Sequence, residues 1–109
     1  MARELTRGDV WMYAFGAPDK RRPVVIIARQ DVIGLLHTVM VAPVASTIYG
    51  APSEVIVGID EGLKRESAVN LDHVQTVEQS QLVRRLGHLG PSKMREVCRR
   101  LAIAAGCAD

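Results

Sequence analysis

The chain has 109 residues, 48% of them hydrophobic and 24% charged, and carries a formal net charge of +2 at pH 7. This length allows one domain, expected over residues 1–109, with one modest core, and the composition is that of an ordinary globular protein. The apolar runs are too short to cross a bilayer, and residues 1–9 lack the apolar core of a signal peptide. We therefore expect a cytoplasmic protein with no membrane association.

The chain reads as short strands separated by turn residues. The first strand is predicted over residues 10–15, and the glycine and Pro-Asp of residues 16–19 predict the turn that ends it. Residues 23–28 are apolar throughout and mostly β-branched, which predicts a central strand. Further strands are predicted over residues 38–44, 53–57, 67–72 and 83–86, and one helical turn over 78–82. In the third strand, Pro43 indicates an edge position or the end of regular pairing.

A C-terminal helix is predicted to begin at Gly90-Pro91-Ser92 and to end at Gly106. The spacing of three and four typical of one buried helix face relates five of its residues, Met94, Val97, Cys98, Leu101 and Ala105. Cys98 is thus expected in the core and Cys107 as a free thiol. Because the two cysteines have neither metal-ligand spacing nor a Cys-x-x-Cys pattern, we expect them to form no zinc site and no disulfide. No cofactor is expected for the chain.

Cations are unevenly distributed, and the cluster Lys20-Arg21-Arg22 stands directly before the predicted central strand. Pro23 presets its own φ and favours an extended conformation for Arg22. An arginine held in this way at the start of a rigid strand can bind or polarise a phosphate; the alternative is a pair of solvated charges. A second pair, Arg84-Arg85, stands at another short strand, and the arginines of the late helix are interpreted as its polar face.

Many short strands followed by one helix predict a small, strongly curved sheet or a partly open barrel, since helical crossovers for parallel strands are missing. Such a small sheet leaves edges and exposed surface, which predicts a homodimer. Trp11, the single tryptophan, is expected in the core, with stacking on a nucleic-acid base as the alternative.

Short strings along nearly the whole chain, in order, resemble the MazF/PemK toxins of bacterial type II toxin–antitoxin systems. The strings are Arg7-Gly8-Asp9-Val10-Trp11, Arg22-Pro23-Val24-Val25, residues 41–47, Gly62-Leu63-Lys64-Arg65-Glu66-Ser67, residues 72–77 and residues 82–89. The resemblance implies a mainly β fold with a C-terminal helix, namely an SH3-like barrel of the plasmid-maintenance-toxin type. It also implies a homodimer and a metal-independent endoribonuclease, an mRNA interferase, that cuts single-stranded RNA.

In this family the ribose 2′-hydroxyl attacks the adjacent phosphorus, which leaves a 2′,3′-cyclic phosphate and a 5′-hydroxyl. The resemblance places Arg22 at the catalytic arginine. Stabilisation of charge is its safer role, because arginine is a poor proton acceptor at neutral pH. The family's catalytic threonine position is occupied by Ala45 here, so the hydroxyl is expected from Ser46 or Thr47.

Five further residues are implied in RNA binding: Lys20, Arg21, Asp72, His73 and Gln75. Lys20 and Arg21 would bind the backbone electrostatically, and Gln75 replaces an arginine that many members carry. Asp72 would contact bases or orient the arginine, or else hold a loop at a strand end. For His73 the alternative to a role at the site is a merely hydrogen-bonded strand residue.

The family resemblance also implies a cognate antitoxin whose acidic, disordered segment folds onto the toxin dimer. Two alternatives remain for the function. Ala45 favours a catalytically weakened member that binds RNA or antitoxin, and the related CcdB group suggests a toxin that acts on gyrase. The start of the strand at Arg22-Pro23 favours the ribonuclease branch.

Overall fold

The computed structural model describes residues 4–16 and 20–108, so most of the predicted turn at 16–19 lies outside the described residues. Within the described residues the sheet has seven strands. They are β1 (Asp9–Ala14), β2 (Arg21–Ile26), β3 (Thr38–Ala45), β4 (Glu54–Val57), β5 (Ser67–Asn70), β6 (Gln75–Glu78) and β7 (Leu82–His88). The helical elements are α1 (Gln30–Ile33), α2 (Pro91–Ala104) and the 3-10 turns η1 (Ile59–Glu61), η2 (Leu71–His73) and η3 (Gln79–Gln81).

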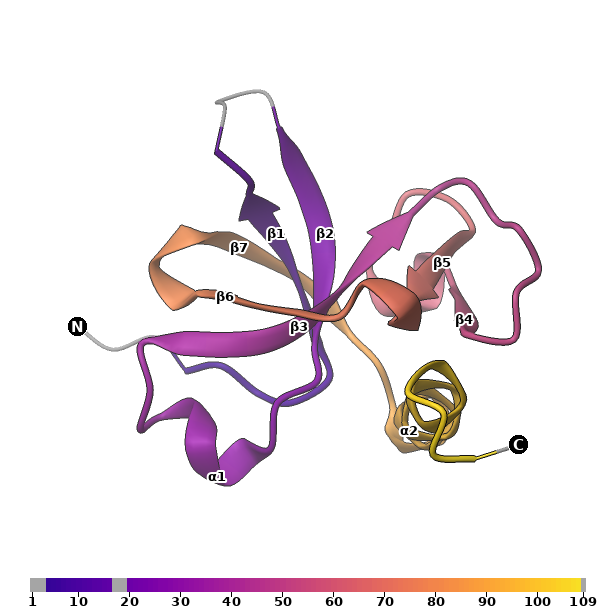
Figure 1. Cartoon of the computed structure of the whole chain (residues 1–109). Helices are drawn as coiled ribbons and strands as arrows, with labels where there is room; N and C mark the ends of the chain where they lie inside the picture. The colour runs from indigo at the N-terminus through magenta and orange to yellow at the C-terminus, as the bar shows by residue number, and fades with distance from the viewer. Residues whose placement is uncertain (1–3, 17–19, 109) are drawn as a thin grey trace.

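The strands pair antiparallel in the order β4-β5-β3-β2-β1-β7, and β6 also pairs with β3. The long strand β3 crosses the middle of the fold (Figure 1) and exchanges one partner along its length. Pairing with β6 ends at Val41, and pairing with β5 begins at Val44. Pro43 lies between these two stretches but stays paired with Val24 of β2, so the end of regular pairing that the sequence predicted applies only to the side of β3 that faces β5 and β6.

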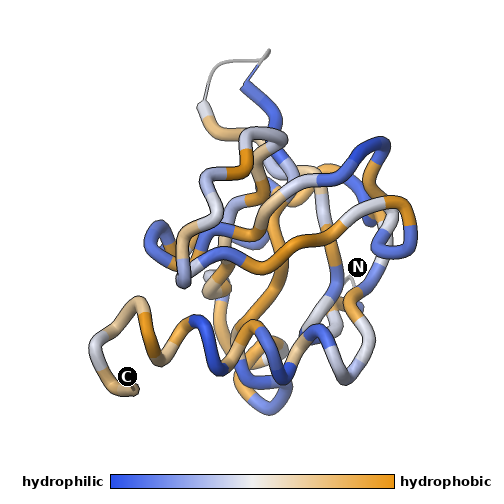
Figure 2. Tube along the Cα trace, turned by 90° about the vertical axis from the view of Figure 1, so that its right-hand side faces the viewer, coloured by the Kyte–Doolittle hydropathy of each residue, from blue (hydrophilic) through white to orange (hydrophobic). Residues whose placement is uncertain are grey.

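The second half of strand β2, residues 24–26, is buried on both faces, which explains the apolar run that follows its two exposed arginines. Val25 packs in one core cluster with Val10 and Val97, whereas Val24 and Ile26 pack in a second cluster. The hydrophobic residues accordingly concentrate in the inner parts of the strands (Figure 2). Trp11 is 7% exposed within the second cluster, which confirms its expected place in the core.

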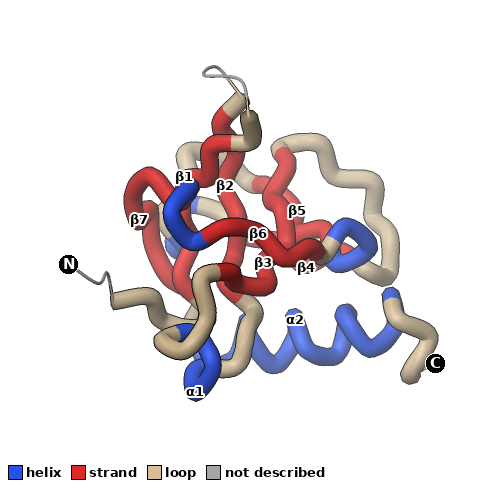
Figure 3. The backbone as a smooth tube through the Cα atoms, turned by 60° about the vertical axis from the view of Figure 1, so that its left-hand side comes forward, coloured by secondary structure: helices blue, strands red, loops and turns tan. Residues whose placement is uncertain are grey.

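Helix α2 lies across one end of the sheet, beside β4 and η2 (Figure 3). Its contacts with the core are made by Val97 together with the half-buried residues Met94, Leu101 and Ala104. The expectation that Cys98 belongs to the core was wrong: the residue is exposed, and its sulfur lies 3.1 Å from Arg7 Nη2. The buried stripe is narrow and follows positions 94, 97, 101 and 104, so Cys98 and Ala105 fall outside it.

The helix ends as its sequence predicts. Gly106 adopts φ +75°, and its N–H donates to the Ile103 carbonyl, the left-handed arrangement that closes many helices. No helix among residues 4–16 and 20–108 is long and apolar enough to cross a membrane.

The predicted strand over 67–72 is wrong in its last two residues, because the chain leaves the sheet after Asn70 and forms η2. The Asn70 side chain accepts a hydrogen bond from the Asp72 N–H at 2.9 Å. Such local capping competes with a strand ladder. Asp72 and His73 therefore belong to a 3-10 turn rather than a strand. Sequence reasoning also missed α1 and β6, and β7 is longer than predicted.

Candidate active site

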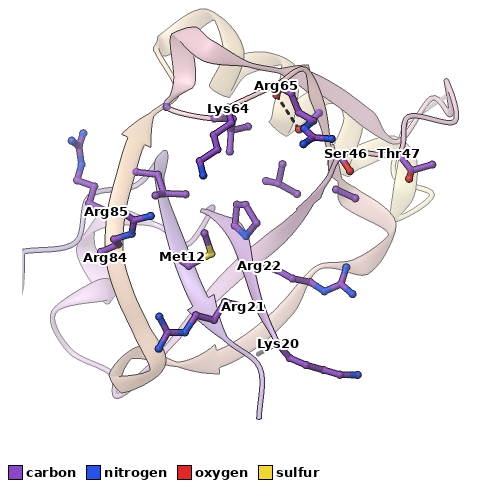
Figure 4. Close-up of a pocket in the computed structure, with 17 residues that line it drawn as sticks. Met12, Lys20, Arg21, Arg22, Ser46, Thr47, Lys64, Arg65, Arg84 and Arg85 are labelled. Carbon is purple, nitrogen blue, oxygen red and sulfur yellow. Dashed lines mark hydrogen bonds between the residues drawn. The ribbon is translucent and has the colours of Figure 1, made fainter. Parts of the chain in front are cut away.

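A cavity of about 900 Å³ lies where the first residues of β2, the end of β3, residues 62–67 and strand β7 meet (Figure 4). Among its lining residues are seven cations, Lys20, Arg21, Arg22, Lys64, Arg65, Arg84 and Arg85. Of the described residues, no Asp, Glu or His lines it. The cavity is thus a strongly electropositive surface, the kind that attracts polyanions.

The two arginines predicted at the strand start are the first two residues of β2, where both are exposed. They pair with Ala14 and Tyr13 of β1, so their backbones belong to a regular two-stranded ladder. In Figure 4, Arg22 points to the side of the cavity that carries Ser46, whereas Arg21 points away from it toward β7. A rigid strand therefore presents two guanidinium groups to different parts of one cavity.

Ser46 and Thr47 follow directly after β3 and line the cavity. Ala45 is the last residue of β3, opposite Ala68 of β5, and is half-buried against the cavity. The exposed Ser46 and Thr47 are thus the first two residues after the pairing of β3 with β5 ends. The structure brings together Arg22, Ser46 and Thr47, the three residues that the sequence implicated in catalysis.

Two glycines explain why the segment after η1 lies against β7. At Gly62 an added Cβ would lie 2.2 Å from the Leu86 carbonyl oxygen, and at Gly87 it would lie 2.2 Å from the Glu61 carbonyl oxygen. Only hydrogen on both α-carbons permits this approach of the two backbones. The contact brings the cations that follow Gly62 to the wall of the cavity opposite β2.

Lys64 and Arg65 from one segment, and Arg84 and Arg85 from β7, are the lining cations that sequence reasoning did not assign to the site. The signal available was the pairing of basic residues, since each pair is adjacent in the chain. Arg85 also has an ion-pair partner, because its Nε lies 3.3 Å from Oδ1 of the buried Asp9. This carboxylate offsets part of the positive charge at the β7 edge of the cavity.

Three predicted RNA-binding residues lie outside the cavity lining: Asp72, His73 and Gln75. Asp72 accepts a hydrogen bond from the Ser53 hydroxyl, which corresponds to its alternative role of holding a loop. His73 is exposed in η2, and Gln75 is exposed in β6 opposite Val41. Their contacts with RNA stay predictions, and the cavity is built without them.

Within the described part of the chain, His, Cys, Asp and Glu side chains do not gather in groups of three or more that could hold a metal ion. His88 is instead engaged with Asp9, its Nδ1 lying 2.9 Å from Asp9 Oδ1. The chemistry that the cavity offers is therefore that of guanidinium, ammonium and hydroxyl groups.

Comparison with known proteins relates this chain to one family. A family model described as "PemK-like, MazF-like toxin of type II toxin-antitoxin system" matches residues 6–105. The probable endoribonuclease MazF5 of Mycobacterium tuberculosis is 43% identical over 104 residues, which cover 94% of each chain.

Solved structures have the same fold. The Mycobacterium tuberculosis toxin MazF-mt6 superposes with a TM-score of 0.84 at 32% identity, covering 93% of this chain and 98% of that one. A mycobacterial endoribonuclease in complex with its cognate antitoxin has a TM-score of 0.84 at 24% identity, covering 94% and 96%. The expected mainly β barrel with a C-terminal helix is confirmed. The chain belongs to the PemK-like and MazF-like toxins of type II toxin–antitoxin systems.

Proposed function

We propose that this protein is the toxin of a type II toxin–antitoxin pair and a metal-independent endoribonuclease that cuts single-stranded RNA. The observation that carries this proposal is the cavity in which Arg22, the Ser46-Thr47 segment and six further cations meet. A single RNA strand needs such a surface, because each phosphate brings a negative charge that a lysine or arginine can neutralise. The relatives named MazF endoribonucleases support the same activity.

In the proposed reaction the ribose 2′-oxygen forms a bond to the adjacent phosphorus as the bond from phosphorus to the 5′-oxygen breaks. The 2′-hydroxyl loses its proton, the leaving 5′-oxygen gains one, and the products are a 2′,3′-cyclic phosphate and a 5′-hydroxyl. Negative charge builds up on the phosphoryl oxygens in between. Since the described lining contains no carboxylate or imidazole, stabilisation of this charge is the contribution that the cavity supports most directly.

Arg22 is the residue proposed to stabilise that charge, because it stands on a paired strand and faces the loop that carries the hydroxyls. Ser46 or Thr47 is proposed to donate a hydrogen bond to the same phosphoryl group. Lys20, Arg21 and the cations opposite β2 are proposed to hold the neighbouring phosphates. This division separates groups that act in the transition state from groups that bind the strand.

A catalytically weakened member is the second candidate, and Ala45 is the observation that favours it. Its methyl group lines the cavity at the position where the family resemblance implies a threonine hydroxyl. Removal of one donor of this kind costs about a hundredfold or more in rate. Binding of RNA without cleavage would distinguish this candidate from the first.

The proposed setting is a cytoplasmic homodimer of single-domain subunits, inhibited by an antitoxin with an acidic, disordered segment. One solved relative is an endoribonuclease in complex with its cognate antitoxin, which supports a partner of this kind. An acidic segment would complement the cationic cavity and compete there with RNA. Titration of the protein with an acidic antitoxin peptide should therefore weaken RNA binding.

The test is incubation of the purified protein with a pool of single-stranded RNA of mixed sequence in EDTA. We expect fragments that end in 2′,3′-cyclic phosphates and begin with 5′-hydroxyls, identified by sequencing with end-specific ligation. RNA with 2′-O-methyl groups at the mapped sites is the control, because it lacks the free nucleophile and should resist cleavage. An intact pool, or cleavage that EDTA abolishes, would refute the proposal.

A further inference from the structure

The loop of residues 46–53 has a demanding path because it joins two strands that run parallel on either side of β5. Ala45 at the end of β3 lies opposite Ala68, whereas Glu54 at the start of β4 lies opposite Asn70. The loop must therefore return along β5 before β4 begins. Its first two residues, Ser46 and Thr47, line the cavity on the way.

Apolar packing anchors the middle of this loop only in part. Ile48 is 37% exposed and therefore partly packed, whereas Tyr49 is 81% exposed. Hydrophobic contacts of the Tyr49 side chain therefore contribute little to holding the backbone at that residue. Hydrogen bonds to the backbone supply the further support.

Glu54 supplies those bonds. Its carboxylate is buried, and Oε1 accepts from the N–H groups of Tyr49 at 3.2 Å and Ala51 at 3.0 Å. Oε2 accepts from the Tyr49 N–H at 3.3 Å, and the N–H of Glu54 donates back to the Ala51 carbonyl at 3.1 Å. Gly50, between the two donor residues, adopts φ +76°. A left-handed residue turns neighbouring N–H groups toward one side and creates a small anion site in the backbone, which the carboxylate occupies.

The remainder of the loop is held in the same manner. Arg100 Nη1 of helix α2 donates to the Pro52 carbonyl at 2.9 Å, and the Leu71 N–H donates to the Ser53 carbonyl at 2.9 Å. Residues 49–53 are thus fixed on one side, and the pairing of Ala45 with Ala68 fixes the other. Ser46, Thr47 and Ile48 form a short bridge whose two ends are both constrained.

We infer that Glu54 is a positioning residue for the hydroxyl groups of Ser46 and Thr47, and this inference rests on the proposed ribonuclease function. Glu54 does not line the cavity and acts through the loop backbone. When the carboxylate is removed, the N–H groups of Tyr49 and Ala51 lose their acceptor and the bridge loses its fixed end. A displacement of about 1 Å at a reacting group can reduce turnover by about a hundredfold.

The kinetic test compares Glu54→Ala and Glu54→Gln with the unchanged protein. We expect kcat to fall by at least about tenfold in Glu54→Ala and by less in Glu54→Gln, whose amide oxygen still accepts one bond. KM should change less than about threefold, because the phosphate-binding cations are untouched. In a background that lacks both loop hydroxyls, Glu54→Ala should change kcat less than about twofold.

Val55→Ala is the matched control for general destabilisation. Val55 is adjacent in β4 and fully buried, but its side chain belongs to the core cluster rather than to the loop. Its truncation should lower Tm while kcat at 25 °C stays within about twofold of the unchanged protein. Equal losses of kcat in Val55→Ala and Glu54→Ala at similar Tm would refute a positioning role.

A measurement without RNA separates this inference from the proposed function. Amide hydrogen exchange at Tyr49 and Ala51 should become at least about tenfold faster in Glu54→Ala, which removes both acceptor oxygens, while exchange in β1 and β2 stays unchanged. Unchanged exchange at both amides would overturn the inference even if the protein cleaves RNA. If the unchanged protein cleaves no RNA, the proposed function fails, and with it the positioning role of Glu54 in catalysis. Faster exchange accompanied by normal kcat would show that the loop does not need this support.

Discussion

Arg22→Ala is the substitution that tests the proposed chemistry most directly. Arg22 is one of seven cations that line the cavity, and it is exposed at the start of β2. If it stabilises charge in the transition state, its loss should reduce kcat/KM by at least about a hundredfold, or about 2.7 kcal/mol. Because the side chain is exposed, the free energy of unfolding should change by no more than about 0.5 kcal/mol.

A purely electrostatic binding role would give a different result. Neutralisation of one phosphate of a single strand changes the slope of log K against log salt concentration by about 0.7. Arg84→Ala is expected to behave in this way, with a shallower salt slope and a raised KM but nearly normal kcat, since β7 lies across the cavity from the loop hydroxyls. Arg22→Ala should instead reduce kcat at saturating RNA.

Single-turnover cleavage of a fluorescent oligonucleotide, measured over a range of protein concentrations at three salt concentrations, provides the rate at saturation and the salt dependence of binding. Arg95→Ala is the control, because Arg95 is exposed on α2 and lies outside the cavity lining. It should leave kcat, KM and the salt slope unchanged. A loss below tenfold in Arg22→Ala, or a loss confined to KM, would assign the transition-state role to another residue.

Three further outcomes are expected. Ser46→Ala or Thr47→Ala should lower single-turnover kcat by about tenfold or more with little change in RNA affinity, and Ala45→Thr should raise it; a rate indifferent to all three changes would show that the loop is not catalytic. Gly87→Ala should destabilise the fold by about 3 kcal/mol or more, because the new Cβ would lie 2.2 Å from the Glu61 carbonyl oxygen, and a thermal unfolding midpoint within a few degrees of normal would contradict this. Light scattering at micromolar concentration should give the mass of a dimer, whereas a monomer would contradict the proposed assembly.

The sequence predicted best those elements whose residue types are compatible with only one kind of position, such as a buried strand or a left-handed helix end. The apolar run that follows Arg22 and Pro23 indicated a central strand, and residues 24–26 of β2 are buried on both faces. Gly106 predicted the end of the last helix and adopts the left-handed conformation there. The predicted strand over 67–72 failed at η2, because the Asn70 side chain accepts a hydrogen bond from the Asp72 N–H. The spacing of hydrophobic residues does not reveal such a local hydrogen bond.

The features of the candidate site also fall into those that could be predicted from the sequence and those that could not. The position of Arg22 at the start of a strand, and of two hydroxyl residues after β3, could be predicted from the sequence, because both depend only on neighbours in the chain. The approach of the cations after Gly62 to those of β7 could not be predicted in this way, since it depends on the contact of two glycine backbones far apart in the chain. Likewise, the burial of Glu54 and its hydrogen bonds to the loop backbone could not be predicted from the composition. Residues that are adjacent in the chain can be identified from the sequence. Segments that are distant in the chain come together only through the curvature and packing of the sheet.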